Sequence, residues 1–507
     1  MIQGMVFVCG AVLMALEIVG SRILSPYFGD SLFVWGSLIG IFLGALSLGY
    51  YCGGIVSDRK PYLRSCAVII AWAALSILII PLTAGPLSRF IVSLNLGDRV
   101  SPLLACLALF FVPSVLLGMV WPFSVKLQTK GMDRVGNVTG LSYALSTLGS
   151  LFGTFFVAFY LIGQFGVISI VIFLGSVLVL LSASIWMTAR ERQKPSFVSL
   201  LTGALFLICV SKPPLFALPP GEIPLYQTDS FYHHITVTEN RSSSVRLLRF
   251  GSHIQTGIFV SGPARSPFAL PDMFHLPLVF NPGIRRALFI GGGGMLGPRA
   301  FYEDYPAVRI DAVEIDPQVA RIAERFFFLP SSERIRVFSG EDGRRFIVSS
   351  DRVYDLIVAD VFNSAGRIPF HLLTKNYFEE LKAHLGPRGV VAFNLVGSFE
   401  GRGSRLIPAV YKTLKQIFPE VYIFPNYRNV PPGPRQRRNF FMIATVSSNR
   451  LSQEEILVAA DWLERTGKVK VPLREYAVNL WVPGSEKRWL ETIPILTDDY
   501  APVDSLI

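Results

Sequence analysis

The chain has 507 residues, of which 51% are hydrophobic and only 16% carry a formal charge. These values exclude an ordinary water-soluble globule, in which about 25% of residues are charged. Residues 1–212 hold only 13 of the 47 Lys and Arg residues and 6 of the 36 Asp and Glu residues. We therefore predict a transmembrane domain over 1–212, a linker with a small β element over 213–280, and a water-soluble domain over 281–507. The excess positive charge lies mainly in the first region, which favours an anionic lipid bilayer over nucleic acid as the partner.

Six apolar runs in the first region are each long enough to cross a hydrocarbon layer of about 30 Å as a helix. They cover 3–24, 33–56, 66–86, 102–125, 138–160 and 163–187. A seventh run, 197–210, is shorter and ends before two prolines, so the sequence agrees with six or with seven spans. The apolar stretches also hold all five cysteines, which leaves the soluble part without a disulfide or a cysteine metal site: Cys9, Cys52, Cys66, Cys106 and Cys209.

Basic residues cluster in three alternate loops, at 59–64, 126–134 and 190–194. The positive-inside rule places these loops and the amino terminus in the cytoplasm. Six spans then leave the soluble domain in the cytoplasm as well, whereas seven spans place it outside.

Glu17 lies inside the first apolar run and Arg22 lies near its end. A charge within a membrane is costly and usually faces a partner or a water-filled cavity, so both residues are functional candidates. The alternative is that they pair with each other or with a neighbouring helix and stabilise packing. Steps of small residues further predict close contacts between helices, at Gly49, Gly53, Gly54, Gly118, Gly140, Gly149 and Gly153.

The pattern changes after about residue 226. Segments 232–238 and 245–250 alternate apolar and polar residues, which predicts a small antiparallel β element. Beyond residue 285 we predict strands at 286–291, 308–314, 335–338, 354–360, 389–396 and 440–446, and helices at 316–328, 369–385 and 404–418. This alternation is typical of a doubly wound Rossmann-type α/β sheet that binds its ligand at the carboxyl ends of the strands.

The first of these strands runs directly into four glycines, beginning with Gly291, Gly292 and Gly293. Without Cβ atoms, such a loop lets the backbone approach a ligand closely. The second strand ends at Glu314, which stands at the offset where an acid accepts hydrogen bonds from ribose hydroxyls.

The third strand leads to Asp342 and Gly343, where a carboxylate can accept a hydrogen bond from an adenine amino group, and the fourth ends at Asp360, which faces the reacting end of the ligand. Acids at three separate strand ends along one edge favour a binding site over coincidence. By contrast, Asp316 precedes Pro317 and is predicted to cap the following helix. We interpret Asp355 as a solvated turn residue at the start of its strand.

The order of these motifs resembles the spermidine synthase (polyamine aminopropyltransferase) family. The motifs are Gly291–Gly293, Val313–Asp316, Glu341–Gly343, Ala359–Asp360 and Phe370–Phe378. The segments Ser230–Val237 and Gly251–Gln255 are similar to the amino-terminal strands of that family. Three further segments resemble its bacterial branch, in which the domain is fused to a transporter-like membrane region: Ala15–Arg22, Pro26–Gly29 and Thr497–Pro502.

This resemblance implies a methyltransferase-like sheet that takes decarboxylated S-adenosylmethionine, or S-adenosylmethionine itself, as a co-substrate, with no permanent cofactor and no metal. It implies that Glu314 binds the ribose, Asp342 the adenine, and that Asp360 is catalytic because it accepts a proton from the attacking amine or orients it. The glycine loop and Gly343 would line the donor site. Positions that would bind the substrate are His233, Gln255 and Asn363.

The chain departs from the family at its amine-binding end. Family members have an acid in the glycine loop and a second acid after the catalytic one, where this chain has Gly294 and Asn363. His233 replaces the usual Gln, and residues 268–274 replace a tyrosine-containing segment, with Asp272 as the acid in it. These changes weaken the case for a polyamine substrate, because the missing acids bind cationic amino groups.

The leading hypothesis is a membrane-bound aminopropyltransferase that converts an amine such as putrescine to spermidine and releases methylthioadenosine. Its use of a cytosolic metabolite favours a bacterial-type inner membrane with the soluble domain in the cytoplasm. The alternatives are another S-adenosylmethionine-dependent reaction, by methyl transfer or sulfonium cleavage, and a non-catalytic adenosyl-binding regulator of a transporter. Transport by six spans alone would require a homodimer.

The basic stretch Arg428–Arg438 leaves two interpretations open. If it borders the site, the acceptor is anionic or membrane-associated. Otherwise it is a solvated loop beside anionic lipid, which is the more ordinary use of such a stretch.

Overall fold

The computed structural model describes the chain except for residues 29–30, 98, 130, 132–133, 190–220, 252, 262–264, 363–367, 402, 429, 432, 482–491 and 507. The chain divides into two compact units. The helical unit comprises Met1–Pro219 and Thr228–His234, and the sheet unit comprises Pro220–Gln227 and Ile235–Ile507.

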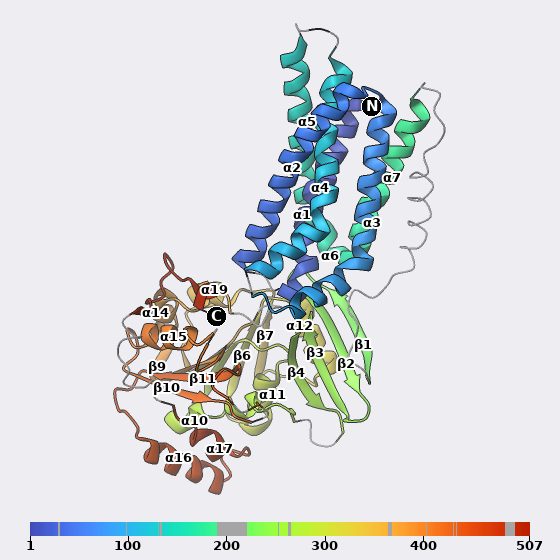
Figure 1. Cartoon of the computed structure of the whole chain (residues 1–507). Helices are drawn as coiled ribbons and strands as arrows, with labels where there is room; N and C mark the ends of the chain where they lie inside the picture. Colours follow the sequence, from blue (N-terminus) through green and yellow to red (C-terminus); the bar gives the residue numbers. More distant parts are fainter. Residues whose placement is uncertain are drawn as a thin grey trace. The chain divides into compact units, whose positions relative to one another are not determined.

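Six helices of the helical unit are long and apolar enough to cross a membrane, judged by length and composition. They confirm the six predicted runs and extend most of them at the ends, because polar residues there continue the helices. The seventh run, 197–210, lies outside the residues that the structure describes. The helices are α1 (Ile2–Phe28), α2 (Leu32–Arg59), α3 (Leu63–Ser93), α4 (Val100–Gln128), α5 (Val135–Phe156) with its continuations η2 (Val157–Leu161) and α6 (Ile162–Gln164), and α7 (Val167–Thr188) (Figure 1).

Glycines bring two pairs of these helices into close contact, as predicted for Gly49, Gly53, Gly118, Gly149 and Gly153. The prediction was wrong for Gly54 and Gly140, because a Cβ atom there would meet no atom of a neighbouring helix within 4 Å among the described residues. A Cβ atom at Gly149 would overlap the carbonyl oxygen of Phe7 in α1, and one at Gly153 would overlap that of Ala11. On α2, a Cβ at Gly53 would lie 2.7 Å from the carbonyl oxygen of Met119 in α4. The backbones of α1 and α5, and of α2 and α4, therefore approach to distances that only glycine permits.

The sheet unit contains a four-stranded sheet in the order β1-β2-β3-β4. The alternating pattern predicted the two middle strands but missed the outer ones. Leu248 and Ile258 of this sheet pack against Val319 and Phe327 beyond it. The strands are β1 (Glu222–Asp229), β2 (His234–Asn240), β3 (Val245–Phe250) and β4 (His253–Phe259) (Figure 1).

A second sheet has seven strands in the order β10-β11-β9-β8-β5-β6-β7. The five strands from β9 to β7 are parallel, whereas β11 pairs antiparallel with β9 and β10 pairs antiparallel with β11. The predicted doubly wound sheet is confirmed, but β10 was missed. The strands are β5 (Arg286–Gly291), β6 (Arg309–Glu314), β7 (Ile335–Ser339), β8 (Tyr354–Asp360), β9 (Leu385–Gly397), β10 (Glu420–Pro425) and β11 (Arg438–Thr445).

Successive residues of the central strands face opposite sides of this sheet and build two cores. Phe289 and Val358 belong to one core, with residues of the helices α9, α10, α16 and α17. Ile290 and Ile357 belong to the other, with residues of α13, α14 and α15. The helices are α9 (Leu270–Met273), α10 (Pro277–Phe280), α11 (Leu296–Asp304), α12 (Pro317–Phe326), α13 (Gly343–Val348), α14 (Lys375–Ala383), α15 (Leu406–Leu414), α16 (Gln453–Arg465), α17 (Leu473–Ala477) and α19 (Val503–Leu506).

The helix predicted over 369–385 is two elements. A short 3-10 turn, η3 (Phe370–Leu372), precedes α14, and the side chain of Thr374 between them accepts a hydrogen bond from the backbone N–H of Tyr377 at 3.3 Å. This cap starts a new helix, because it satisfies an N–H group that has no partner within the first turn. The sequence prediction also missed α11, α13 and the helices after residue 450.

Candidate active site at the ends of β5, β6 and β8

Strand order reverses between β5 and β8, and a glycine turn follows β5 at this point. The φ angles of Gly291, Gly292 and Gly293 are 73°, 140° and 51°, which are left-handed conformations that favour glycine. Gly291 pairs with Asp360, and a Cβ atom on Gly291 would lie 2.5 Å from the carbonyl oxygen of Asp360. Glycine at this position therefore lets the loop and the end of β8 lie side by side, in the crevice where open α/β sheets bind ligands.

Glu314 is the last residue of β6, on the other side of β5, and only 6% of its surface is exposed. Its Oε1 accepts a hydrogen bond from the backbone N–H of Asp316 at 3.0 Å. Burial, together with the negative charges of Asp316 and Asp360, raises the pKa of Glu314 to about 8. Glu314 and Asp360 end the two strands that pair with β5 on either side, so these two acids lie at one edge of the sheet, as predicted.

Asp342 follows β7 and caps α13, because its Oδ1 accepts a hydrogen bond from the N–H of Arg345 at 2.9 Å. Its Oδ2 lies 3.8 Å from Nε2 of His371. The hydrogen-bonding influence of His371 is the main reason why the pKa of Asp342 lies below its usual value. A Cβ atom at Gly343 would overlap Cγ2 of Ile290, so glycine lets α13 begin directly against β5. The capping role of Asp342 was not predicted.

Asp360 ends β8 and accepts a hydrogen bond from one amide side chain, which a second amide side chain holds in place. The Nδ2 of Asn394 donates to Oδ1 of Asp360 at 2.8 Å, and the Nδ2 of Asn439 donates to Oδ1 of Asn394 at 2.9 Å. Burial raises the pKa of Asp360 to about 6, and the hydrogen bond from Asn394 opposes that rise. Sequence reasoning missed both asparagines, although each interrupts an otherwise apolar strand, which was the signal available.

A charged network beside Asp342 was also missed. Nη2 of Arg344 lies 2.7 Å from carboxylate oxygens of both Glu380 and Asp498. The Thr374 hydroxyl donates to Oδ1 of Asp498 at 2.6 Å. Asp498 belongs to the segment Thr497–Pro502, so this carboxyl-terminal motif is attached to α13 and α14 next to the position predicted for adenine.

Gln255 and Thr256 of β4 contact the glycine loop. A Cβ atom on Gly293 would lie 3.5 Å from the Cβ of Gln255, which is ordinary van der Waals contact. A Cβ atom on Gly294 would overlap Cγ2 of Thr256 and lie 3.2 Å from the ring of Phe327. The position where the family has an acid is therefore filled by neighbouring side chains, which sequence comparison alone does not reveal.

His233 lies in the turn between β1 and β2, within the helical unit. Its side chain is buried, and burial together with the positive charge of Arg22 lowers its pKa to about 3.

Glu17 on α1 is partly buried and takes part in no ion pair among the residues described, so the predicted alternative in which it pairs with Arg22 is not observed. Asn363 lies outside the described part of the chain. Within that part, no group of three or more His, Cys, Asp and Glu side chains is arranged to bind a metal.

Three secondary predictions have clear outcomes. Asp316 caps α12, as predicted, by accepting from the N–H of Gln318 at 2.9 Å. Asp355 lies at the start of its strand, as predicted, but within β8 and not in a turn, and its Oδ2 accepts from the backbone N–H groups of Arg285 and Arg286. The basic stretch Arg428–Arg438 is not wholly solvated either. Only 4% of Arg438 is exposed, and its guanidinium lies over two rings, those of Phe399 and Tyr427.

Comparison with known proteins identifies relatives of the sheet unit. The family profile for the spermine/spermidine synthase domain matches residues 270–450. A human eEF1A lysine and N-terminal methyltransferase is 28% identical over 190 residues, which is 35% of this chain and 26% of that protein. The crystal structure of spermidine synthase from Thermotoga maritima has 16% sequence identity and a TM-score of 0.42, and the match covers 53% of this chain and 88% of that one.

The polyamine aminopropyltransferase of Vibrio vulnificus (strain CMCP6) is 30% identical over 308 residues. The match covers 59% of this chain and 96% of the Vibrio protein, so it spans nearly the whole of that relative. The chain belongs to the polyamine aminopropyltransferase family.

Proposed function

We propose that this protein is a membrane-bound aminopropyltransferase. It transfers the aminopropyl group of decarboxylated S-adenosylmethionine to an amine of the putrescine type and releases methylthioadenosine. The observation that carries the proposal is the position of Asp360, which ends β8 beside Gly291 and accepts a hydrogen bond from Asn394 at 2.8 Å. The 96% coverage of a polyamine aminopropyltransferase supports the same reaction class.

The donor would lie along the carboxyl edge of the sheet. The glycine loop allows its close approach, Glu314 accepts hydrogen bonds from the ribose hydroxyls, and Asp342 accepts one from the adenine amino group. The Glu314 pKa of about 8 means that this carboxyl holds a proton in part at neutral pH. Ribose hydroxyls favour its ionised form, so donor binding is expected to release that proton.

The reaction needs a base more than an acid. The amine nitrogen attacks the methylene carbon bonded to the sulfonium, a C–N bond forms, and the C–S bond breaks with its electron pair going to sulfur. The neutral amine attacks with its lone pair, the new C–N bond leaves the nitrogen as a secondary ammonium, and Asp360 would accept the proton that this nitrogen loses. With a pKa of about 6, Asp360 is ionised at neutral pH and is a stronger base than an ordinary aspartate. The hydrogen bond from Asn394 orients the carboxylate toward this role.

The six long apolar helices support a location in a membrane. The basic loops favour a cytoplasmic amino terminus, and the use of a cytosolic nucleoside donor favours the cytoplasm for the soluble domain. We therefore place the protein in a bacterial-type inner membrane.

Full-length protein in lipid nanodiscs tests the reaction directly. Incubation with decarboxylated S-adenosylmethionine and putrescine should yield equal amounts of methylthioadenosine and spermidine, measured by mass spectrometry. The matched variant Asp360→Asn keeps the size of the side chain and should lose about 100-fold or more in turnover while still binding methylthioadenosine. Binding of the nucleoside by the unaltered protein without product formation would overturn the proposal.

A second candidate is methyl transfer from S-adenosylmethionine. It is favoured by the filled space at Gly294, because the family's acid for the aminopropyl ammonium has no room there. S-adenosylmethionine carries a carboxylate beside its ammonium group, unlike its decarboxylated form. A site without an acid at position 294 does not repel that carboxylate. The match to a methyltransferase over 35% of the chain agrees with this candidate. Parallel incubation with S-adenosylmethionine separates the two, since methyl transfer releases adenosylhomocysteine instead of methylthioadenosine.

A further inference from the structure

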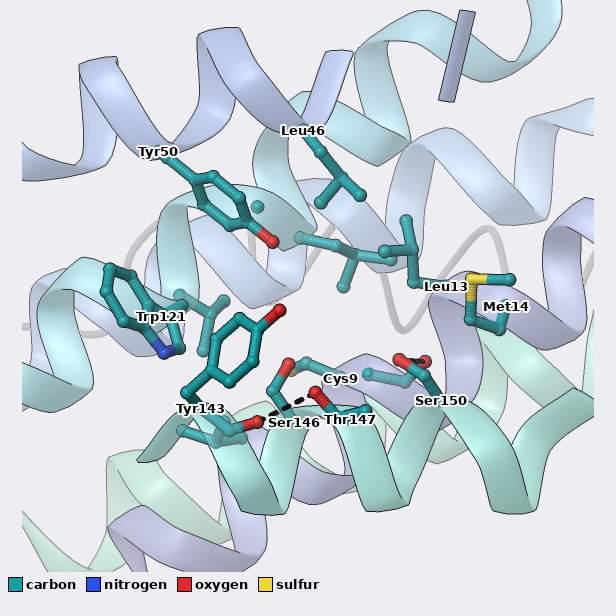
Figure 2. Close-up of a pocket in the computed structure, with 15 residues that line it drawn as sticks. Cys9, Leu13, Met14, Leu46, Tyr50, Trp121, Tyr143, Ser146, Thr147 and Ser150 are labelled. Atoms are coloured by element: carbon teal, nitrogen blue, oxygen red, sulfur yellow. Dashed lines mark hydrogen bonds between the residues drawn. The ribbon is translucent and has the colours of Figure 1, made fainter. Parts of the chain in front are cut away.

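A cavity of about 140 Å³ lies in the helical unit, between α1, α2, α4 and α5. One part of its wall is apolar and comes mainly from α1 and α4, with Leu13 and Leu117 as examples. The other part carries polar groups from three helices. Figure 2 shows the hydroxyl groups of Tyr50 on α2 and Tyr143 on α5 pointing into the space between these helices. Tyr143 lines the cavity and is 64% exposed, so its side chain also reaches the outer surface of the helical unit.

The polar part of the wall presents both hydrogen-bond acceptors and a hydrogen-bond donor to the cavity. The Thr147 hydroxyl donates to the carbonyl oxygen of Tyr143 at 3.0 Å, and the Ser150 hydroxyl donates to that of Gly10 at 3.3 Å. Both hydroxyl protons are therefore used in hydrogen bonds to the backbone, so each oxygen can act toward the cavity only as an acceptor. The indole N–H of Trp121 is buried and has no acceptor among the described residues.

Aromatic rings add negative potential to the wall, and one acid lies on α1 beyond the lining residues. The rings of Tyr50 and Trp121 have centroids 5.7 Å apart at an angle of 58°, and each has a face with negative potential. The fifteen residues that line the cavity include no Lys, Arg or His. Met14 lines the cavity, and Glu17 stands three residues further along α1, which places it one turn away on the same helix face.

We infer that this cavity binds a primary alkylamine of putrescine size. The inference rests on the proposed function, which makes such amines the acceptor of the soluble domain. The ammonium N–H groups would donate to the hydroxyl oxygens of Thr147 and Ser150, and the charge would be attracted by the faces of Tyr50 and Trp121. Glu17 supplies the compensating charge, and the alkyl chain contacts the apolar wall.

The size of the cavity agrees with this ligand. An apolar protein cavity of about 150 Å³ accepts benzene, which has as many non-hydrogen atoms as putrescine. A membrane-embedded amine site also gives the apolar half a role in the same chemistry as the sheet unit, because it binds the same class of molecule.

Equilibrium dialysis with radiolabelled putrescine counts the sites on the full-length protein in nanodiscs. The expected number for the unaltered chain is two, one in the sheet unit and one in the cavity. Thr147 is exposed on α5, so Thr147→Leu fills the cavity without disturbing a buried contact. Glu17→Gln removes the compensating charge and keeps the shape. Each variant should weaken one of the two sites at least tenfold. The matched control is Tyr51→Phe, since Tyr51 is 69% exposed and does not line the cavity.

The same experiment separates this inference from the proposed function. If the sheet unit binds no amine, the unaltered chain has one site, and Thr147→Leu and Glu17→Gln still remove it. If both variants bind putrescine with the same number and affinity as Tyr51→Phe, the cavity is not an amine site. Equal displacement of putrescine from that site by 1,4-butanediol, which has the same chain length without charge, would also overturn the inference.

Discussion

The side-chain amide of Asn394 donates a hydrogen bond to Oδ1 of Asp360 at 2.8 Å, which joins the middle of β9 to the last residue of β8. The oxygen of the same amide accepts from Nδ2 of Asn439 at 2.9 Å. Because Asn439 occupies that oxygen, the nitrogen of Asn394 must face Asp360. The carboxyl group of Asp360 therefore always meets a donor, which favours its ionised form.

Removal of this donor should move the acid limb of the pH profile. Asp360 has a pKa of about 6 and accepts a proton only when ionised, so kcat/KM should fall as pH falls through about 6. The variant Asn394→Leu loses the hydrogen bond that lowers this pKa, so the limb should shift to higher pH. Methylthioadenosine formation measured between about pH 5 and 9 gives the profile. Thr445→Val, a buried change on β11, is the control and should leave the limb unmoved. An unchanged limb in Asn394→Leu would show that Asn394 does not tune Asp360.

Nucleoside binding should be coupled to release of a proton from Glu314. The pKa of Glu314 is about 8 before binding, and ribose hydroxyls stabilise the ionised carboxylate, so affinity for methylthioadenosine should rise between about pH 6 and 8. Calorimetry in two buffers of different ionisation enthalpy measures the released proton. Glu314→Gln should bind about tenfold more weakly or worse and lose the pH dependence. The same substitution at the exposed Glu324 of α12 should change neither property. Equal proton release by Glu314→Gln and the unaltered chain would assign the proton to another group.

Two glycines of the same loop should respond differently to alanine. Gly291→Ala places a Cβ atom 2.5 Å from the carbonyl oxygen of Asp360. It also forces alanine into the left-handed backbone conformation of Gly291, which is unfavourable for a residue with a Cβ atom. Gly293→Ala carries only the conformational penalty of about 1–2 kcal/mol, because its Cβ would meet Gln255 at 3.5 Å. The thermal midpoint and the affinity for methylthioadenosine should therefore both be lower for Gly291→Ala than for Gly293→Ala. The reverse order would mean that the ends of β5 and β8 are not held at the observed separation.

Reintroducing the family's acid should require room for it. Gly294→Asp alone should destabilise the protein, because its Cβ atom would overlap Cγ2 of Thr256. Thr256→Ser removes that methyl group, so the double variant should recover much of the lost stability. The double variant should also favour decarboxylated S-adenosylmethionine over S-adenosylmethionine relative to the unaltered chain, in competition binding experiments. Equal destabilisation by the single and double variants would locate the obstruction elsewhere, at Phe327.

The sequence by itself determined those features that depend on local pattern. Six apolar runs predicted the six long helices, because the thickness of a bilayer sets a length that can be counted along the chain. The strand predicted at 354–360 has the observed bounds, because both its ends are marked by acids around an apolar run. The acids Glu314, Asp342 and Asp360 follow successive predicted strands. Because the carboxyl ends of parallel strands lie at one edge of a sheet, this order predicted that the three acids share that edge.

Only the tertiary structure decided which distant side chains meet. Arg344 and Asp498 are 154 residues apart in the sequence, and neither residue type reveals the other as its partner. The filled space at Gly294 depends on Thr256 of another sheet, and the cavity beside Trp121 depends on the packing of four helices. The pKa of about 6 for Asp360 arises from burial and from Asn394 together. Such properties depend on distances between side chains from separate segments, and packing sets those distances after the local elements have formed.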